Sequence, residues 1–241
     1  MTEITLPTHD MLELLELYRD TFAAFERILI SENRKFNLTR ITESEQIRLR
    51  HFVDSMAALP ALDQLSTALN KPLRILDIGS GAGFPGLVLA IVRPDWQVTS
   101  LEATGKKAQF QKMVCDELKL SNVTVIHGRA EEVAHEARYR EQFDAVMARA
   151  LAALPILAEL SLGFVKPSGL SLYWKGPGED NQAALPAIEQ MGAIIEDILA
   201  YTLEAHDNPA KLSLVICKKM KPTPKQYPRV FGMIKMKPLS N

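Results

Sequence analysis

The chain has 241 residues, of which 47% are hydrophobic and 24% charged, with 12 glycines and 14 prolines, as in a globular protein of one domain plus an extension. Its longest apolar run, residues 87–92, is far shorter than the roughly 20 residues of a membrane-spanning helix, and the first residues show no signal-peptide pattern, so we expect no membrane association. Cys115 and Cys217 have no neighbouring cysteine, which excludes a cysteine zinc site and a disulfide scaffold and favours a cytoplasmic protein.

The net charge of −1 conceals an uneven distribution of charged residues. Residues 211–241 contain eight lysines or arginines and no aspartate or glutamate, so the rest of the chain is acidic. A basic segment of this kind is typical of proteins that bind a polyanion, but a solvated terminus that only aids solubility has the same composition. Charge alone leaves these two interpretations about equally open.

The first 70 residues have a helical pattern. Apolar side chains recur at helical spacing over residues 11–30, and a second amphipathic stretch covers residues 44–59. Between them, Arg34, Lys35 and Arg40 surround Asn37 in a segment too polar for the core. We therefore expect a helical N-terminal extension.

After residue 70 the pattern changes to alternating strands and helices. Short apolar runs typical of strands occur at residues 73–78, 98–101, 123–126, 143–147 and 170–174. Helical segments separate them, so we expect βαβ units and a mostly parallel sheet. Residues 193–203 and 211–217 follow one another without a helix, which predicts an antiparallel hairpin at the sheet edge.

A glycine-rich turn, Asp77-Ile-Gly79-Ser-Gly81-Ala-Gly83, directly follows the first strand of this domain. Glycine permits the positive φ angles that let a backbone approach a ligand closely, and open α/β sheets bind ligands at this end of their strands. Because Gly81, Gly83 and Gly86 also fit the dinucleotide fingerprint, the glycines alone do not distinguish NAD from an adenosyl cofactor.

Two acidic residues help to separate these alternatives. Glu102 closes the second strand of the domain, where a carboxylate can accept hydrogen bonds from both ribose hydroxyls of either cofactor. Asp77 closes the first strand, and its charge would repel a pyrophosphate but attract the cationic methionine part of S-adenosylmethionine. Asp77 therefore favours S-adenosylmethionine, with another nucleotide cofactor as the alternative.

The spacing of Asp77, Gly79, Gly81 and Gly83 resembles motif I of the class I methyltransferases, an α/β class with a Rossmann-like, seven-stranded, mostly parallel sheet and an antiparallel C-terminal hairpin. Seven short motifs narrow this resemblance, because their order and spacing are similar to those of one family. They are Asn37-Leu-Thr39, Arg50-His-Phe-Val-Asp54-Ser55, the stretch 77–87, Ile91-Val-Arg-Pro94, Lys106-Lys107, Gly128-Arg-Ala-Glu131 and Ala148-Arg149-Ala150. Over about residues 30–180 the chain resembles the small-subunit rRNA methyltransferase G family, also called glucose-inhibited division protein B.

This resemblance implies S-adenosylmethionine-dependent methylation of N7 of one guanine in a loop of 16S rRNA near the decoding region, with 16S rRNA or the 30S subunit as partner. It also implies a set of cofactor contacts by motif position. Together with the loop residues above, the expected cofactor-binding residues are Asp77, Gly79, Gly81, Gly83, Phe84, Glu102, Ala103, Thr104, Ala130, Glu131 and Arg149. The five histidines lack metal-binding spacing, so we expect no metal, and we expect a monomer.

The residues present agree with methylation at N7. Guanine N7 carries an in-plane lone pair, so its methylation needs alignment but no general base. Methylation of an exocyclic amine would favour an Asn/Asp-Pro-Pro-aromatic motif after the fourth strand, where this chain has Arg149-Ala-Leu-Ala. Methylation of cytosine C5 needs a cysteine nucleophile, and neither Cys115 nor Cys217 is well placed.

Arg149 is the candidate catalytic residue. We expect its guanidinium to bind the cofactor or the carbonyl edge of the target base; the structural alternative is an ion pair with a helix-terminal carboxylate. Arg50, His51 and Asp54 are candidates for closing the site from the N-terminal extension, or for tying that extension to the core.

Aromatic and basic residues suggest where RNA binds. Tyr173 and Trp174 are candidates for stacking on an extruded guanine, although such side chains more often pack in the core or at its rim. Arg34, Lys35, Arg40 and the basic tail are candidates for phosphate contacts. The tail segment Gln226-Tyr-Pro-Arg229 is similar to the ending of many family members, but Gly232-Met-Ile departs from their Gly-x-Pro.

We therefore expect a helical extension at residues 1–70, a methyltransferase domain at 71–218 and a basic tail at 219–241. Two other functions remain open: a methyltransferase for a small molecule, and a non-catalytic RNA-binding assembly factor that has kept the fold.

Overall fold

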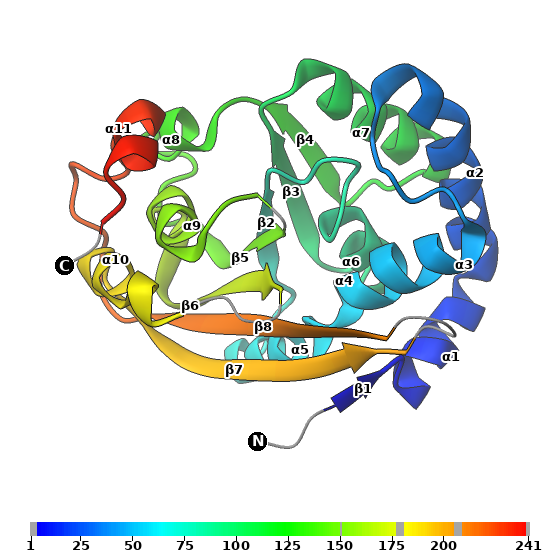
Figure 1. Cartoon of the computed structure of the whole chain (residues 1–241), viewed down its shortest axis with the longest axis horizontal. Helices are drawn as coiled ribbons and strands as arrows, with labels where there is room; N and C mark the ends of the chain where they lie inside the picture. The colour runs from blue at the N-terminus through cyan, green and yellow to red at the C-terminus, as the bar shows by residue number, and fades with distance from the viewer. Residues whose placement is uncertain (1–3, 150, 177–180, 205–208, 240–241) are drawn as a thin grey trace.

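The computed structural model of the chain describes residues 4–149, 151–176, 181–204 and 209–239 (Figure 1). Its strands form one mixed sheet of eight strands in the order β1-β7-β8-β6-β5-β2-β3-β4. They are β1 (Ile4–Leu6), β2 (Arg74–Ile78), β3 (Gln97–Glu102), β4 (Val123–His127), β5 (Phe143–Arg149), β6 (Val165–Lys175), β7 (Ala193–Leu203) and β8 (Ala210–Lys219). Only β8 runs antiparallel to its neighbours, β6 and β7.

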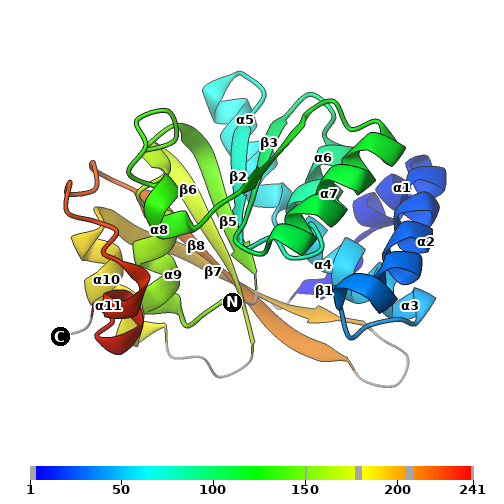
Figure 2. The same cartoon turned by 90° about the horizontal axis from the view of Figure 1, so that it is seen from above.

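Helices cover both faces of this sheet. The described helices are α1 (His9–Leu17), α2 (Arg19–Phe36), α3 (Ser44–Ile47), the π-helical segment η1 (Arg48–Val53), α4 (Asp54–Met56), α5 (Leu59–Leu69), α6 (Gly86–Val92), α7 (Gly105–Leu118), α8 (Ala130–Val133), α9 (Leu154–Ser161), the 3-10 turn η2 (Gln182–Ala184), α10 (Leu185–Gln190) and α11 (Phe231–Met236). Figure 2 shows α8–α11 on one side of the sheet and α1, α2, α6 and α7 on the other. Within the described ranges, no helix combines the length and apolar character that a membrane crossing requires.

Each helical layer packs on the sheet through its own apolar cluster. The cluster under the N-terminal helices includes Phe25, Phe52 and Phe110, all buried. The opposite cluster includes Leu157 of α9 and Ile188 of α10. Because both faces are covered, the central strand β2 is buried from Ile75 to Ile78, which explains its nearly continuous apolar sequence.

The order of the strands places a crevice at the carboxyl ends of β2 and β5. The chain passes from β2 to β3 and β4 in one direction and then returns to β5 on the other side of β2. Parallel α/β sheets bind ligands at such a reversal, because the loops that leave the two central strands diverge there.

The predicted α/β fold class is confirmed, with one strand more than the seven expected. Ile4–Leu6, within the extension that we predicted to be helical, forms β1 and pairs in parallel with Tyr201–Leu203 of β7. The predicted hairpin is present as β7 and β8, but β1 covers β7, so β7 is not an edge strand. A strand of three residues is too short to show periodicity, and it forms here because the edge of β7 supplies its hydrogen-bonding partners.

The predicted boundaries near residues 70 and 218 stay predictions, but the segments beyond them pack closely on the central domain. Phe25 of α2 stacks on Phe84, which follows the glycine turn, with ring centroids 5.2 Å apart. In the tail, Thr223, Tyr227 and Ile234 are buried.

Candidate active site

The glycine turn after β2 forms one wall of the crevice. Gly79, Gly81 and Gly83 have φ angles of 64°, 60° and 93°, as expected from the sequence. A Cβ atom at Gly83 would lie 2.4 Å from the side chain of Leu87, and one at Gly79 would lie 2.7 Å from that of Leu151. Larger residues at these two positions would therefore meet both backbone strain and steric overlap.

A buried polar network supports this turn from below. Gln111 of α7 is fully buried and donates from Nε2 to Ser80 Oγ and to the carbonyl of Gly81, both at 2.8 Å. Ser80 Oγ lies 2.5 Å from Ser100 Oγ, which in turn donates to Gln111 Oε1. Gln111 was not predicted as a site residue, although the sequence contains a signal: Gln111 shares a face of α7 with the buried Ala108 and Val114.

Glu102 joins the end of β3 to the glycine turn. Its carboxylate is 5% exposed and accepts hydrogen bonds from Gly81 N at 2.9 Å and from Thr104 N at 2.7 Å. Each oxygen keeps a second lone pair, so the carboxylate is oriented for the hydroxyl groups of a ribose. The exposed Thr104 contributes to this geometry through its backbone.

Asp77 lies beneath the turn and is fully buried. Its Oδ2 accepts a hydrogen bond from Gly86 N at 2.7 Å, whereas Oδ1 has no partner among the described residues. Burial raises the pKa of Asp77 to about 7, and the Gly86 N–H and Arg149 oppose this shift. A buried acceptor without a partner fits a cationic donor, so these residues suit the methionine end of S-adenosylmethionine.

A cavity of about 130 Å³ lies at the carboxyl ends of β2, β3, β4 and β5. Four predicted cofactor residues line it: Gly79, Ala103, Ala130 and Glu131. It is also lined by residues that the sequence did not indicate, including Leu151, Ala152 and Phe231. The structure thus brings together side chains and backbone from four strand ends and from the C-terminal segment.

A second cavity, of about 570 Å³, adjoins the first and shares Leu151 and Ala152 with it. Arg149 lines this second cavity and not the first. The other residues along it come from distant parts of the chain: Ile41, Arg50, His51, Asp54, Trp174, Lys175, Gly176, Tyr201, Leu203 and Leu212. A ligand in one cavity and a ligand in the other would therefore meet at the segment after β5.

Arg149 is held by an ion pair in the wall of the second cavity. Its Nη1 donates to Asp54 Oδ2 at 2.8 Å and to the carbonyl of Arg50 at 3.0 Å, and its side chain is 12% exposed. Asp54 Oδ1 accepts a hydrogen bond from Tyr201 OH at 2.6 Å. Arg149 therefore does pair with a carboxylate, as the structural alternative supposed, but it does so beside the cavity.

His51 completes this network. Its ring stacks on Phe84 with centroids 4.4 Å apart, its Nδ1 lies 3.4 Å from Arg149 Nη2, and its Nε2 lies 2.9 Å from Thr39 Oγ1. Burial, followed by the charge of Arg149, lowers the pKa of His51 to about 3, so the ring is neutral at pH 7. The π-helical segment η1 contributes both Arg50 and His51, and such segments are common at functional sites.

Six of the predicted cofactor residues line neither cavity: Asp77, Gly81, Gly83, Phe84, Glu102 and Thr104. Gly83 is buried behind the turn, and the ring of Phe84 lies between His51 and Phe25. Tyr173 is fully buried with its hydroxyl 2.5 Å from Ser161 Oγ, so of the two alternatives given for this residue it packs in the core and does not offer its ring to a base. Trp174 does line the second cavity, where its Nε1 donates to the carbonyl of Asp54 at 2.8 Å.

The basic tail is partly internal. Lys219 is fully buried and donates to the carbonyl of Leu162 at 2.6 Å and to Thr223 Oγ1. Arg229 pairs with the fully buried Glu159 of α9. Neither side chain is placed for a phosphate, whereas Lys221, Lys225 and Lys235 are exposed.

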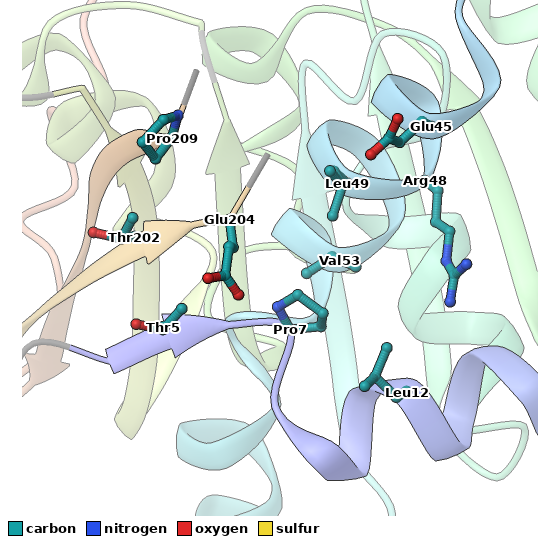
Figure 3. Close-up of a pocket in the computed structure, with 10 residues that line it drawn as sticks. All are labelled: Thr5, Pro7, Leu12, Glu45, Arg48, Leu49, Val53, Thr202, Glu204 and Pro209. Atoms are coloured by element: carbon teal, nitrogen blue, oxygen red, sulfur yellow. The ribbon is translucent and has the colours of Figure 1, made fainter. Parts of the chain in front are cut away.

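A larger cavity of about 920 Å³ lies apart from this crevice, between β1, α1 and η1 (Figure 3). Glu204 lies at the end of β7, while Glu45 and Arg48 lie on the helix across the opening (Figure 3). It shares no lining residue with the two cavities at the strand ends, and its charged groups do not converge on one point. We therefore place the candidate active site at the two smaller cavities.

The chain is similar in sequence to known proteins. Residues 19–202 match the family GidB, described as rRNA small subunit methyltransferase G. A protein named Ribosomal RNA small subunit methyltransferase G from Clostridium novyi (strain NT) is 40% identical over 230 residues, which cover 95% of this chain and 92% of the relative. Its namesake from Clostridium botulinum (strain Loch Maree / Type A3) is 39% identical over 220 residues, which cover 90% of this chain and 89% of the relative.

Among solved structures, precorrin-6y C5,15-methyltransferase from Geobacter metallireducens GS-15 matches with a TM-score of 0.52 and 16% identity, covering 78% of this chain and 96% of that chain. This likeness shows a shared fold. The resemblance found in the sequence is confirmed by the family match: the chain belongs to the rRNA small subunit methyltransferase G family of S-adenosylmethionine-dependent methyltransferases.

Proposed function

We propose that this enzyme transfers the methyl group of S-adenosylmethionine to N7 of a guanine in 16S rRNA. The cofactor occupies the cavity of about 130 Å³, called the smaller cavity from here on, and the guanine occupies the adjoining cavity of about 570 Å³, called the larger cavity. The observation that carries this assignment is that the two cavities adjoin at Leu151 and Ala152, beside Arg149. Methyl transfer requires donor and acceptor atoms to be held in contact and in line, which adjoining cavities provide.

In this arrangement the cofactor lies along the strand ends. S-adenosylmethionine supplies a methyl group bound to a positively charged sulfur. Asp77 would accept a hydrogen bond from its amino group, and Glu102 would accept hydrogen bonds from its ribose. Gly79, Gly81, Ala103 and Thr104 allow the ligand to approach the backbone, and Ala130 and Glu131 contact the adenine.

The larger cavity offers donors to the acceptor base. Arg149 and the buried Lys175 lie along it, and such groups bind guanine O6 well. Lys175 also donates to the carbonyl of Ala152, which fixes its position. Asp54 neutralises Arg149, so the cavity tolerates the positive charge that guanine acquires when N7 is methylated.

The reaction needs no proton acceptor. The N7 lone pair forms the new N–C bond, the electron pair of the S–C bond returns to sulfur, and no proton is removed. The ionisable groups along the cavity fit this chemistry. His51 is neutral, and Asp54 is already occupied, because its Oδ2 accepts a hydrogen bond from Arg149 and its Oδ1 accepts one from Tyr201.

We propose further that the enzyme acts as a cytoplasmic monomer on 16S rRNA within the small subunit. The exposed side chains of Arg34, Lys35 and Arg40 lie on α2 and the segment that follows it, which leads to Thr39 beside His51. Phosphate contacts there would orient the rRNA loop toward the larger cavity.

Nucleoside mass spectrometry of 16S rRNA from cells that lack the gene tests this proposal. We expect a single 7-methylguanosine to disappear and to return when the purified enzyme and S-adenosylmethionine are added to the isolated subunits. An unchanged nucleoside profile would support a small-molecule acceptor if the protein binds the cofactor. The same profile without cofactor binding in calorimetry would support a non-catalytic assembly factor.

A further inference from the structure

The C-terminal helix α11 reaches the smaller cavity, although it lies far from the cofactor motifs in the sequence. Of the described residues that line this cavity, Phe231 alone comes from the chain beyond α9. It is the first residue of α11 and is partly exposed. In Figure 1, α11 lies beside α8 and above α9.

Two buried anchors fix the position of this helix. On one side, Arg229 donates from Nε and Nη2 to the two carboxylate oxygens of Glu159 at 2.8 and 2.6 Å, and its backbone N–H donates to the same carboxylate at 2.9 Å. Glu159 is fully buried, and a two-pronged pair of this kind is a strong, directional contact. On the other side, Ile234 of α11 is fully buried.

Further contacts hold the chain that leads to α11. His135 Nε2 lies 2.8 Å from the carbonyl oxygen of Pro228, and Arg140 donates to the carbonyls of Thr223, Pro224 and Tyr227. The segment that carries Phe231 is therefore attached to the domain at several points before Phe231 in the chain and at Ile234 after it. These contacts fix the position of Phe231.

The ring of Phe231 lies next to the segment that follows β4. The guanidinium carbon of Arg129 is 5.2 Å from the ring centroid, and Arg129 Nε donates to Glu131 Oε1 at 2.6 Å. Strands β2, β3 and β4 lie side by side in that order. A cofactor with its amino group at β2 and its ribose at β3 therefore has its adenine at β4, next to Phe231.

We propose that Phe231 is a binding residue for the adenine ring of S-adenosylmethionine, and that α11 is a fixed wall of the cofactor site rather than part of a solvated tail. This inference rests on the proposed placement of the cofactor in the smaller cavity. An aromatic ring offers a flat, apolar face that stacks on a purine, and Arg129, whose guanidinium carbon is 5.2 Å from the ring centroid, lines the same cavity.

Calorimetric titration of the purified full chain tests the assignment without RNA. The ligands are S-adenosylmethionine and 5′-methylthioadenosine, which keeps the adenosyl group but lacks the amino acid. For Phe231→Ala we expect Kd to rise about tenfold for both ligands, equivalent to about 1.4 kcal/mol, and for Phe231→Leu we expect a smaller rise. Met233→Ala, an exposed position on the same helix, serves as the control and is expected to keep the wild-type Kd.

Melting temperatures without ligand show whether each variant is folded. The inference is wrong if folded Phe231→Ala and Phe231→Leu both bind the two ligands within twofold of wild type. The inference would also be overturned if affinity fell for S-adenosylmethionine but not for 5′-methylthioadenosine, because Phe231 would then contact the methionine half of the cofactor. Glu102→Ala separates the two proposals: if it weakens binding while the Phe231 variants do not, only this inference fails, and if it too has no effect, the placement of the cofactor fails.

Discussion

The two adjoining cavities are built in different ways. Around the smaller one, backbone N–H groups of Gly81, Gly86 and Thr104 orient the carboxylates of Asp77 and Glu102. Around the larger one, side chains orient one another: Asp54, Arg149 and Tyr201 form one hydrogen-bonded network from three distant segments. The proposed cofactor side is thus shaped by local backbone geometry, and the proposed acceptor side by long-range contacts between side chains.

This difference also separates the roles of the charged residues. Arg149 lines only the larger of the two cavities, whereas Asp77 lines neither and lies buried beneath the glycine turn, with its Oδ1 unpaired among the described residues. Substitutions on the two sides should therefore separate methyl transfer from cofactor binding.

The largest effect is expected at Arg149. Arg149→Ala removes a donor to the acceptor base, so we expect turnover on small subunits to fall by about 100-fold or more, while Kd for S-adenosylmethionine changes less than about threefold. Single-turnover transfer of labelled methyl groups measures the first quantity and calorimetry the second.

Loss of Arg149 also leaves Asp54 buried without its partner, which destabilises proteins by about 3–5 kcal/mol. Arg149→Lys keeps the charge but removes the guanidinium, so it tests whether the charge alone suffices. Arg48→Ala, which replaces an exposed arginine on the neighbouring η1, serves as the control. Wild-type turnover in a folded Arg149→Ala protein would remove Arg149 from the mechanism. If cofactor affinity fell in parallel with turnover, Arg149 would be a cofactor-binding residue instead.

A smaller effect of opposite sign on stability is expected at Asp77. The folded-state pKa of about 7 lies above the ordinary value of 3.8, so the stability of the cofactor-free protein falls as pH rises from about 4 to 7. Asp77→Asn removes this loss and can keep the hydrogen bond from Gly86. We expect its melting temperature to exceed that of wild type by about 5 °C at pH 8 and by less at pH 5.

The same substitution should weaken cofactor binding about tenfold or more, because a charged hydrogen bond is lost. In wild type, binding of a cation beside Asp77 should release a proton near pH 6–7, and calorimetry in two buffers of different ionisation enthalpy measures it. Equal proton release by Asp77→Asn and wild type would show that another group titrates.

The smallest effect is expected at the exposed lysines of the tail. Replacing Lys221, Lys225 and Lys235 by glutamine should reduce the slope of log K against log salt for rRNA binding by about one or less per lysine. Cofactor affinity should stay unchanged. This substitution is a better test than removing residues 219–241, which would also remove the buried Lys219, Arg229 and Phe231. A slope identical to wild type would mean that these lysines are only solvated surface.

The local features of the site were easier to predict from the sequence than the features made by distant contacts, for a physical reason. Glycine turns and strand-end acids are local features, so Gly79, Asp77 and Glu102 are visible as a pattern. Gln111 and Phe231 lie far in the sequence from the residues beside which they are placed. The sequence around each of them is that of an ordinary core helix or an ordinary tail. The strand Ile4–Leu6 was missed on the same ground, since only its pairing with β7 defines it.

The position of Phe231 in the wall of the smaller cavity has a consequence for the order of events during synthesis. Ribosomes add residues from the N-terminus, so the glycine turn, the acids and the segment after β4 all exist before α11 does. All eight strands precede Phe231 in the chain, so a chain that ended before Val230 would contain every strand of the sheet but lack one wall of the smaller cavity. The site reaches its final shape only when this late segment docks on Glu159.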